Sequence, residues 1–139
     1  MFDVALASAG ASVILATSSD DKYPPENMLD GNTETFWTTT GLFPQEFIIK
    51  FETVMTIEKV HISSYNVRKM RLEVSEHDVE DKFEILNERE FEATDSQLQE
   101  EDFKVGNRRA LSLRVVIESG YDHFVSIHKV TVNGNALHG

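Results

Sequence analysis

Short segments in which apolar residues occupy every second position run through much of the chain. The first clear one carries Phe47, Ile49 and Phe51. Side chains of a β-strand point alternately to opposite faces, so this spacing predicts a strand with one face turned to a core. The same period recurs in Met70, Leu72 and Val74, in Leu111, Leu113, Val115 and Ile117, and in a final strand from about Phe124 to Val132.

The segment from Met55 to Ser63 interrupts this alternation. Ile57 is followed by Val60 and Ile62, so the apolar positions slip by one residue. An extra residue in one strand of an antiparallel pair produces such a slip, and the sequence therefore predicts a β-bulge here.

Helical periodicity is weak throughout the sequence. The best helical candidate is a single turn from Glu26 to Leu29. Seven or eight short strands separated by turn residues predict an all-β fold, an antiparallel β-sandwich. The length of 139 residues is that of one ordinary domain, so we expect a single domain over residues 1–139, with a frayed tail from about residue 135.

The loop over residues 24–37 holds the candidate chemistry. It combines two prolines, an Asp-Gly turn and the chain's one tryptophan. We expect oxygens of Asn27, Asp30, Asn32 and Thr35 to converge on one point, and an all-oxygen cluster suits a hard cation such as Ca²⁺. The alternative is a purely structural turn, in which Asp and Asn side chains bond to their own backbone.

This loop does not have the spacing of an EF-hand. Counting from Asp30, the sixth position is Thr35 rather than glycine, and the twelfth is Gly41 rather than glutamate. Backbone carbonyls would therefore have to supply much of the coordination, and a bound Ca²⁺ would stabilise the loop rather than act as a signal.

The net charge of −11 is concentrated in one part of the chain. Residues 73–102 hold 13 acidic and 2 basic side chains, a difference that equals the whole net charge. Phe83, Ile85 and Phe91 lie in this stretch and predict one or two edge-like strands. The acids are either a solvated strand–loop region or a docking face for a basic partner. No basic stripe with interleaved aromatic residues is present, so we expect no nucleic-acid binding.

Several functional classes lack their sequence signals. No apolar run approaches the roughly 18 residues of a membrane helix, so we expect no stable membrane insertion. The chain has no cysteine, no Gly-x-Ser-x-Gly elbow and no glycine-rich phosphate loop, and its five histidines form no close pair. We therefore expect a protein that is not an enzyme and has no catalytic residues.

The run from Asn27 to Trp37 resembles the signature of discoidin domains, the type C domains of coagulation factors, which are related to galactose-binding jelly rolls. The segments 47–51 and 130–134 resemble strands of the same family. The resemblance covers essentially the whole chain and implies a jelly-roll β-sandwich. It also implies a structural Ca²⁺ whose ligands are Asn27, Asp30 and Thr35, through a mixture of side-chain and backbone oxygens.

A more specific resemblance is to the family of discoidin-like subunits of the intraflagellar transport B complex. The residues that carry it are 16–20, 24–27, 36–41, 43–47 and 121–124. That family has also been described as small-heat-shock-like, but the sequence shows no α-crystallin signature.

This resemblance implies a non-enzymatic adaptor in the cilium or flagellum and the cytoplasm. It implies a stable heterodimer with a Rab-like small GTPase, contacts with other B-complex subunits, and support of ciliary cargo traffic that includes Hedgehog-pathway components. Other discoidin domains suggest the alternative, a calcium-stabilised module that binds carbohydrates or lipid head groups.

Overall fold

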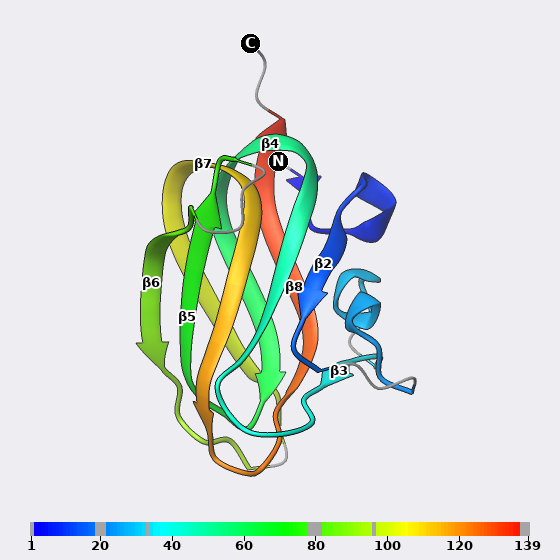
Figure 1. Cartoon of the computed structure of the whole chain (residues 1–139), viewed down its shortest axis with the longest axis vertical. Helices are drawn as coiled ribbons and strands as arrows, with labels where there is room; N and C mark the ends of the chain where they lie inside the picture. Colours follow the sequence, from blue (N-terminus) through cyan, green and yellow to red (C-terminus); the bar gives the residue numbers. More distant parts are fainter. Residues whose placement is uncertain (1, 19–21, 33, 78–81, 96, 137–139) are drawn as a thin grey trace.

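Antiparallel strands make up most of the molecule (Figure 1). The computed structural model describes residues 2–18, 22–32, 34–77, 82–95 and 97–136. The strands are β1 (Phe2–Asp3), β2 (Ser12–Ala16), β3 (Trp37–Thr38), β4 (Gln45–Tyr65), β5 (Val67–Ser75), β6 (Glu84–Glu90), β7 (Gln99–Gly120) and β8 (Ser126–Ala136). Two 3₁₀ turns, η1 (Ala7–Ala9) and η2 (Pro25–Leu29), complete the described elements.

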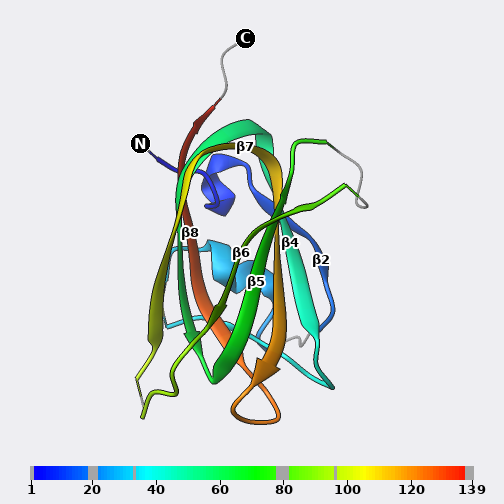
Figure 2. The same ribbon diagram turned by 90° about the vertical axis from the view of Figure 1, so that its left-hand side faces the viewer.

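Two layers form because β4 and β7 are long enough to take part in both. Residues 45–50 of β4 pair with 112–117 of β7, whereas residues 59–64 pair with 99–104. Both strands arch over one end of the molecule between these pairings (Figure 2). The first layer adds β2, β5 and β6, and the second adds β8 with β1 and β3 on it. The predicted antiparallel β-sandwich is confirmed.

The core lies between the two layers and follows the predicted alternation. Phe47 and Ile49 of β4 and Leu113, Val115 and Ile117 of β7 have no solvent exposure. All five belong to one continuous hydrophobic cluster. Full burial of such side chains contributes about 1.5–3 kcal/mol each, which makes this cluster the main source of stability.

The single strand β4 covers both segments, 47–51 and 55–63, that the sequence predicts as separate strands. Its pairing register shifts between Lys50 and Met55, where the strand turns over the end of the sandwich, and again between Ile57 and Lys59. The second shift is the predicted bulge. The predicted helical turn is also present, as η2.

The first half of β7 was not predicted from the sequence. Only Phe103 and Val105 in residues 99–105 pack in or against the core, and acidic residues interrupt the apolar pattern. Positive φ angles at Gly106 and Asn107 then bend the strand. After the bend the inward-facing positions are different: Ala110 is buried, whereas Leu111 is partly exposed.

The last strand is shifted relative to the prediction. It begins at Ser126 rather than Phe124 and continues to Ala136, so residues 135 and 136 of the expected tail are paired with β4. Residues 137–139 lie outside the described part of the chain. Among the described residues, no helix is long and apolar enough to cross a membrane.

Candidate functional site

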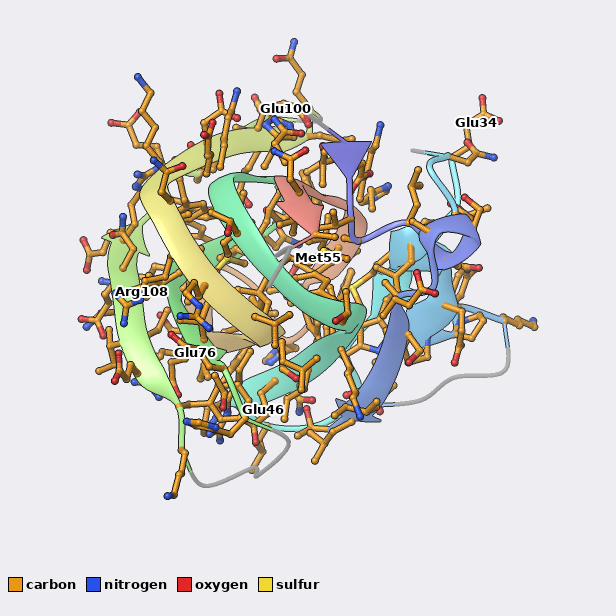
Figure 3. All side chains as sticks on the ribbon, turned by 90° about the horizontal axis from the view of Figure 1, so that it is seen from above. Glu34, Glu46, Met55, Glu76, Glu100 and Arg108 are labelled. Carbon is orange, nitrogen blue, oxygen red and sulfur yellow. The ribbon has the colours of Figure 1, made fainter. Side chains whose placement is uncertain are left out.

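Trp37 anchors the loop that the sequence singles out. It is fully buried, and its indole Nε1 donates a hydrogen bond of 2.9 Å to the Ser18 carbonyl oxygen. Its ring packs against the Phe47 ring in an edge-to-face arrangement, with centroids 5.3 Å apart. At the other end of the loop, Met28 and Leu29 of η2 are buried. The loop is thus attached at both ends to a rigid layer, at the side of the sandwich where Glu34 projects (Figure 3).

The Thr35 hydroxyl lies at the centre of an oxygen cluster within this loop. Its Oγ1 is 2.5 Å from Asp30 Oδ2, 3.0 Å from the Asn32 carbonyl oxygen and 3.4 Å from the Asn27 carbonyl oxygen. One hydroxyl carries one hydrogen, so these acceptors outnumber the available donor. Hard cations bind such clusters of carboxylate, carbonyl and hydroxyl oxygens. The donor set therefore fits the cation chemistry expected for Asn27, Asp30 and Thr35.

The side chains of the loop also form the local turn bonds of the structural alternative. Asp30 Oδ1 accepts from the Asn32 amide at 2.8 Å, and Asn32 Oδ1 accepts from the Glu34 amide at 2.9 Å. The Asn27 side chain points elsewhere, because its Nδ2 donates to the Phe36 carbonyl at 3.0 Å. Asn27 therefore faces the cluster with its backbone oxygen. Residue types alone could not show this, since it depends on the peptide orientation.

In the part of the chain that the structure describes, acidic and histidine side chains elsewhere do not offer a comparable site. Among the described residues, no group of three or more His, Cys, Asp or Glu side chains is arranged to hold a metal ion. The Asp30 loop is of a different kind, because most of its converging oxygens come from carbonyls and a hydroxyl.

The acidic stretch over residues 73–102 is partly neutralised by neighbouring strands. Asp102 lies 2.5 Å from His61 Nδ1 and 3.4 Å from Lys59 Nζ. The hydrogen bond from His61 holds the pKa of Asp102 below its ordinary value. The carboxylate of Glu88 likewise raises the pKa of Lys69. These pairs join β4 to β7 and β5 to β6, so part of the acidity has a structural role.

A shallow groove of about 250 Å³ lies on the outer side of the second layer. Its lining residues are Tyr65 of β4, His128 of β8, and Gln97 and Leu98, which precede β7. Local spacing in the sequence does not link Tyr65 to Leu98. These residues are far apart along the chain, so only the pairing of β4 with β7 and β8 shows that they meet.

Residues 13–130 match the model of the F5/8 type C domain, a span that includes the Asp30 loop and most of both layers. The chain is 47% identical over 135 residues to a human protein named intraflagellar transport protein 25 homolog, covering 97% of this chain and 94% of the relative. The chain belongs to the intraflagellar transport protein 25 family of F5/8 type C domains.

Other members of the intraflagellar transport protein 25 family are similar along most of their length. The mouse homolog is 48% identical, with 95% of this chain and 92% of the relative covered. The protein from Chlamydomonas reinhardtii is 40% identical, with 96% of this chain and 70% of the relative covered.

Solved structures share the fold at much lower identity. A family 32 carbohydrate-binding module from C. perfringens NanJ, solved in complex with galactose, has a TM-score of 0.80 and 15% identity, covering 94% of this chain and 97% of that chain. A second such module, from a Clostridium perfringens family 31 glycoside hydrolase, has a TM-score of 0.78 and 20% identity, with 95% and 96% covered. These likenesses show the jelly-roll fold alone.

Proposed function

We propose that this chain is a non-enzymatic adaptor subunit of the intraflagellar transport B complex, acting in the cilium or flagellum and in the cytoplasm. The observation that carries the proposal is the 47% identity to the human relative, which extends over 97% of this chain and 94% of that protein. The match extends over nearly the whole domain, and an adaptor acts through the surface of such a domain rather than through an active site.

The direct partner in this proposal is a Rab-like small GTPase, bound as a stable heterodimer. Through that dimer, the chain supports ciliary cargo traffic that includes Hedgehog-pathway components. A stable interface of this kind buries about 1,600 Å² in total, with aromatic residues and arginine enriched at its centre. Half-buried rings such as Tyr65 and Phe36 on the outer side of the second layer support an interaction of this type.

A structural Ca²⁺ in the Asp30 loop is the second part of the proposal. The Asp30 carboxylate, the Thr35 hydroxyl and the backbone oxygens of Asn27 and Asn32 would hold it. The ion would supply positive charge to an acceptor-rich turn and thereby hold the loop against the sandwich.

A tagged pull-down from ciliated-cell extract, with mass spectrometry of the bound proteins, tests the adaptor role. We expect the chain to recover a Rab-like GTPase together with other B-complex subunits, and the tag alone to recover neither. Mixing the purified chain with the purified GTPase then tests whether the contact is direct. A well-expressed bait that recovers no transport subunit would contradict the proposal.

A carbohydrate- or lipid-head-group-binding module is the second candidate function. It is favoured by Leu42, Tyr121 and Phe124, whose side chains are 89%, 47% and 46% exposed on two loops. The Thr39 amide donates to the Val125 carbonyl at 3.0 Å, which ties the two loops together. Glycan arrays and liposome flotation test this function. This function would be supported if the wild-type chain binds a glycan or liposome and the substitutions Leu42→Ser and Phe124→Ser abolish that binding.

A further inference from the structure

The first layer ends in two edge strands, β2 and β6, at opposite borders of the sheet (Figure 1). In the described part of the chain, β2 pairs only with β4 and β6 pairs only with β5. The unpaired N–H and C=O groups of an edge strand can bind another extended chain unless charged side chains or a covering element protect them. The two edges differ in this protection.

The edge formed by β6 is protected by charge. Glu84, Glu88 and Glu90 are exposed along it. Arg89 extends from the same strand and donates a hydrogen bond of 2.8 Å to the Asp102 carbonyl of β7. Charged side chains on an edge strand discourage pairing with a further strand, so β6 is suited to remain the border of the sheet.

The edge formed by β2 has no charged protection. The sequence contains no charged residue from position 4 to position 19, although the whole chain carries a net charge of −11. None of the five residues of β2 is fully buried, and the Ile14 side chain is 45% exposed. An uncharged, accessible edge that is rich in apolar residues favours the addition of an extended chain.

The backbone of β2 has hydrogen-bonding groups that point away from the sheet. The Thr17 amide donates to the Glu46 carbonyl at 3.0 Å, so the backbone of Thr17 faces β4. Successive residues of a strand direct their N–H and C=O groups to opposite sides, so those of Ala16 point away from β4. Among the described residues, no backbone hydrogen bond joins residues 12–16 to an element other than β4.

The side chains next to this edge are apolar and accessible from outside the sandwich. Leu15 lies opposite Ile48 of β4, and neither belongs to the core cluster between the layers, so both lie on the outer side of the first layer. The turn η2 contacts β2 from the inner side, because its Met28 and Leu29 belong to that cluster. Ile14 and Leu15 can therefore contact an added chain without loss of core packing.

The length of the edge determines what can bind to it. The pairing of β2 with β4 shifts register between Val13 and Leu15, so a regular added strand meets only residues 14–17. Such a ladder is about 13 Å long. It is too short to provide the roughly 1,200 Å² that a stable dimer buries, and the net charge of −11 repels a second copy of this chain. A short extended segment of another protein fits the edge.

We infer that residues 14–17, the β2 edge, bind an uncharged extended segment of a B-complex subunit other than the GTPase. The segment adds to the first layer as a further strand and bonds to the outward backbone groups of Ala16. Its apolar side chains contact Ile14 and Leu15. This inference rests on the proposed membership of the B complex and identifies a second contact within it.

Hydrogen–deuterium exchange of the peptide that contains residues 12–17 tests the inference. Mass spectrometry measures it in the free chain, in the heterodimer with the proposed GTPase, and in the B complex purified through a tag on this chain. Strand addition protects the outward amide of Ala16, so we expect its exchange to slow by about 10-fold or more in the complex. The free chain and the heterodimer should exchange equally fast.

A pair of substitutions tests the edge directly. Ile14→Lys places a charge on the β2 edge, and Ile85→Lys makes the same change on β6, where Ile85 is 64% exposed. Both variants should keep the wild-type melting temperature and the GTPase. We expect Ile14→Lys to reduce the recovery of the other B-complex subunits, relative to the GTPase, by about 5-fold, and Ile85→Lys to reduce it by less than about 2-fold.

The outcomes separate this inference from the function on which it rests. If residues 12–17 exchange equally fast in the free chain and in the B complex, or are already protected in the heterodimer, the inference is overturned. Undiminished recovery of the subunits by a natively folded Ile14→Lys variant overturns it as well. If the tagged wild-type chain recovers no B-complex subunit, the proposed function fails and the inference fails with it.

Discussion

Asp30 combines two interactions that a substitution can separate. Its Oδ1 accepts a hydrogen bond from the Asn32 amide, and its Oδ2 accepts one from the Thr35 hydroxyl. A neutral amide oxygen can serve as the first acceptor, whereas a cation is attracted to the full carboxylate charge. Asp30→Asn therefore tests whether an ion binds, and Asp30→Ala tests how much the hydrogen bonds of the turn contribute to stability.

We expect Ca²⁺ to raise the melting temperature of the wild-type chain above its value in chelator. At a free Ca²⁺ concentration of 100 times the Kd, the expected gain is about 2.7 kcal/mol. Asp30→Asn should lose this gain and melt near the wild-type temperature in chelator, whereas Asp30→Ala should be destabilised in both conditions. Differential scanning fluorimetry measures all three. Identical melting of the wild-type chain with and without Ca²⁺ would exclude a stabilising site.

At the scale of elements, Gln99 joins the start of β7 to the turn between β4 and β5. Its Oε1 accepts from the Val67 amide at 3.0 Å and from the Ser64 hydroxyl at 3.1 Å. Its Nε2 donates to the carbonyls of Val67 and Glu92 at 2.8 and 2.9 Å. The side chain is buried, so these hydrogen bonds are shielded from water.

We expect Gln99→Glu to lower the free energy of unfolding by about 2–4 kcal/mol. A carboxylate cannot donate to the carbonyls of Val67 and Glu92, and its charge would be buried against them. Gln97→Glu is the matched control, because Gln97 is exposed just before the same strand, and it should change stability by less than about 0.5 kcal/mol. Urea unfolding followed by circular dichroism measures both. Equal stability of the two variants would show that the Gln99 bonds contribute nothing.

The contact between His61 and Asp102 makes the pairing of β4 with β7 sensitive to acid. The lowered pKa of Asp102 in the folded state means that its contribution is present above its ordinary, unfolded pKa. That contribution is lost as the pH falls through the lowered value. The effect is small because half of the carboxylate side chain is exposed.

We expect Asp102→Asn to be less stable than the wild-type chain at pH 7 and to lose less stability on acidification. Urea unfolding between pH 7 and pH 3 measures the difference in the free energy of unfolding between the two proteins. This difference should narrow as Asp102 protonates. Glu90→Gln is the control, because Glu90 is an exposed acid on β6. Parallel pH curves for Asp102→Asn and the wild-type chain would contradict this assignment.

At the scale of the whole molecule, the net charge of −11 is distributed unevenly. The described part of the acidic stretch runs from the end of β5 through β6 to the start of β7, and β6 lies on the side of the molecule away from η1 and η2 (Figure 1). Strand pairing thus gathers on one side charges that are already close in sequence. An asymmetric field of this kind steers the encounter with a basic partner and is screened by salt.

We expect reversal of Glu90, Glu92 and Asp95 to lysine to slow association with the proposed GTPase partner by about 10-fold at low salt. The control reverses Glu26, Glu52 and Glu58, which makes the same change in net charge outside the acidic stretch. Stopped-flow association rates measured across salt concentrations distinguish the two. A rate that is unchanged by the first set, or independent of salt in the wild-type chain, would exclude electrostatic steering.

The sequence by itself determined the features that depend on local spacing. The alternation of Phe47 and Ile49 indicates which face of β4 is buried, and the slip after Ile57 indicates the bulge. The turn η2 follows from its prolines, and the oxygen-rich composition around Asp30 singled out the candidate cation loop. These predictions succeed because each depends on a few neighbouring residues and on which of them must avoid water.

Only the tertiary structure decided the features that depend on distant partners. The acidic segment before Phe103 becomes a strand because β4 supplies its hydrogen bonds, although its own pattern is too polar to predict one. Likewise, Tyr65, Leu98 and His128 form a groove only because three strands bring them together. The Asn27 oxygen that faces Thr35 is set by the path of the backbone. Contacts of this kind arise from packing between segments far apart in the chain. The local spacing of apolar and polar residues therefore cannot predict them.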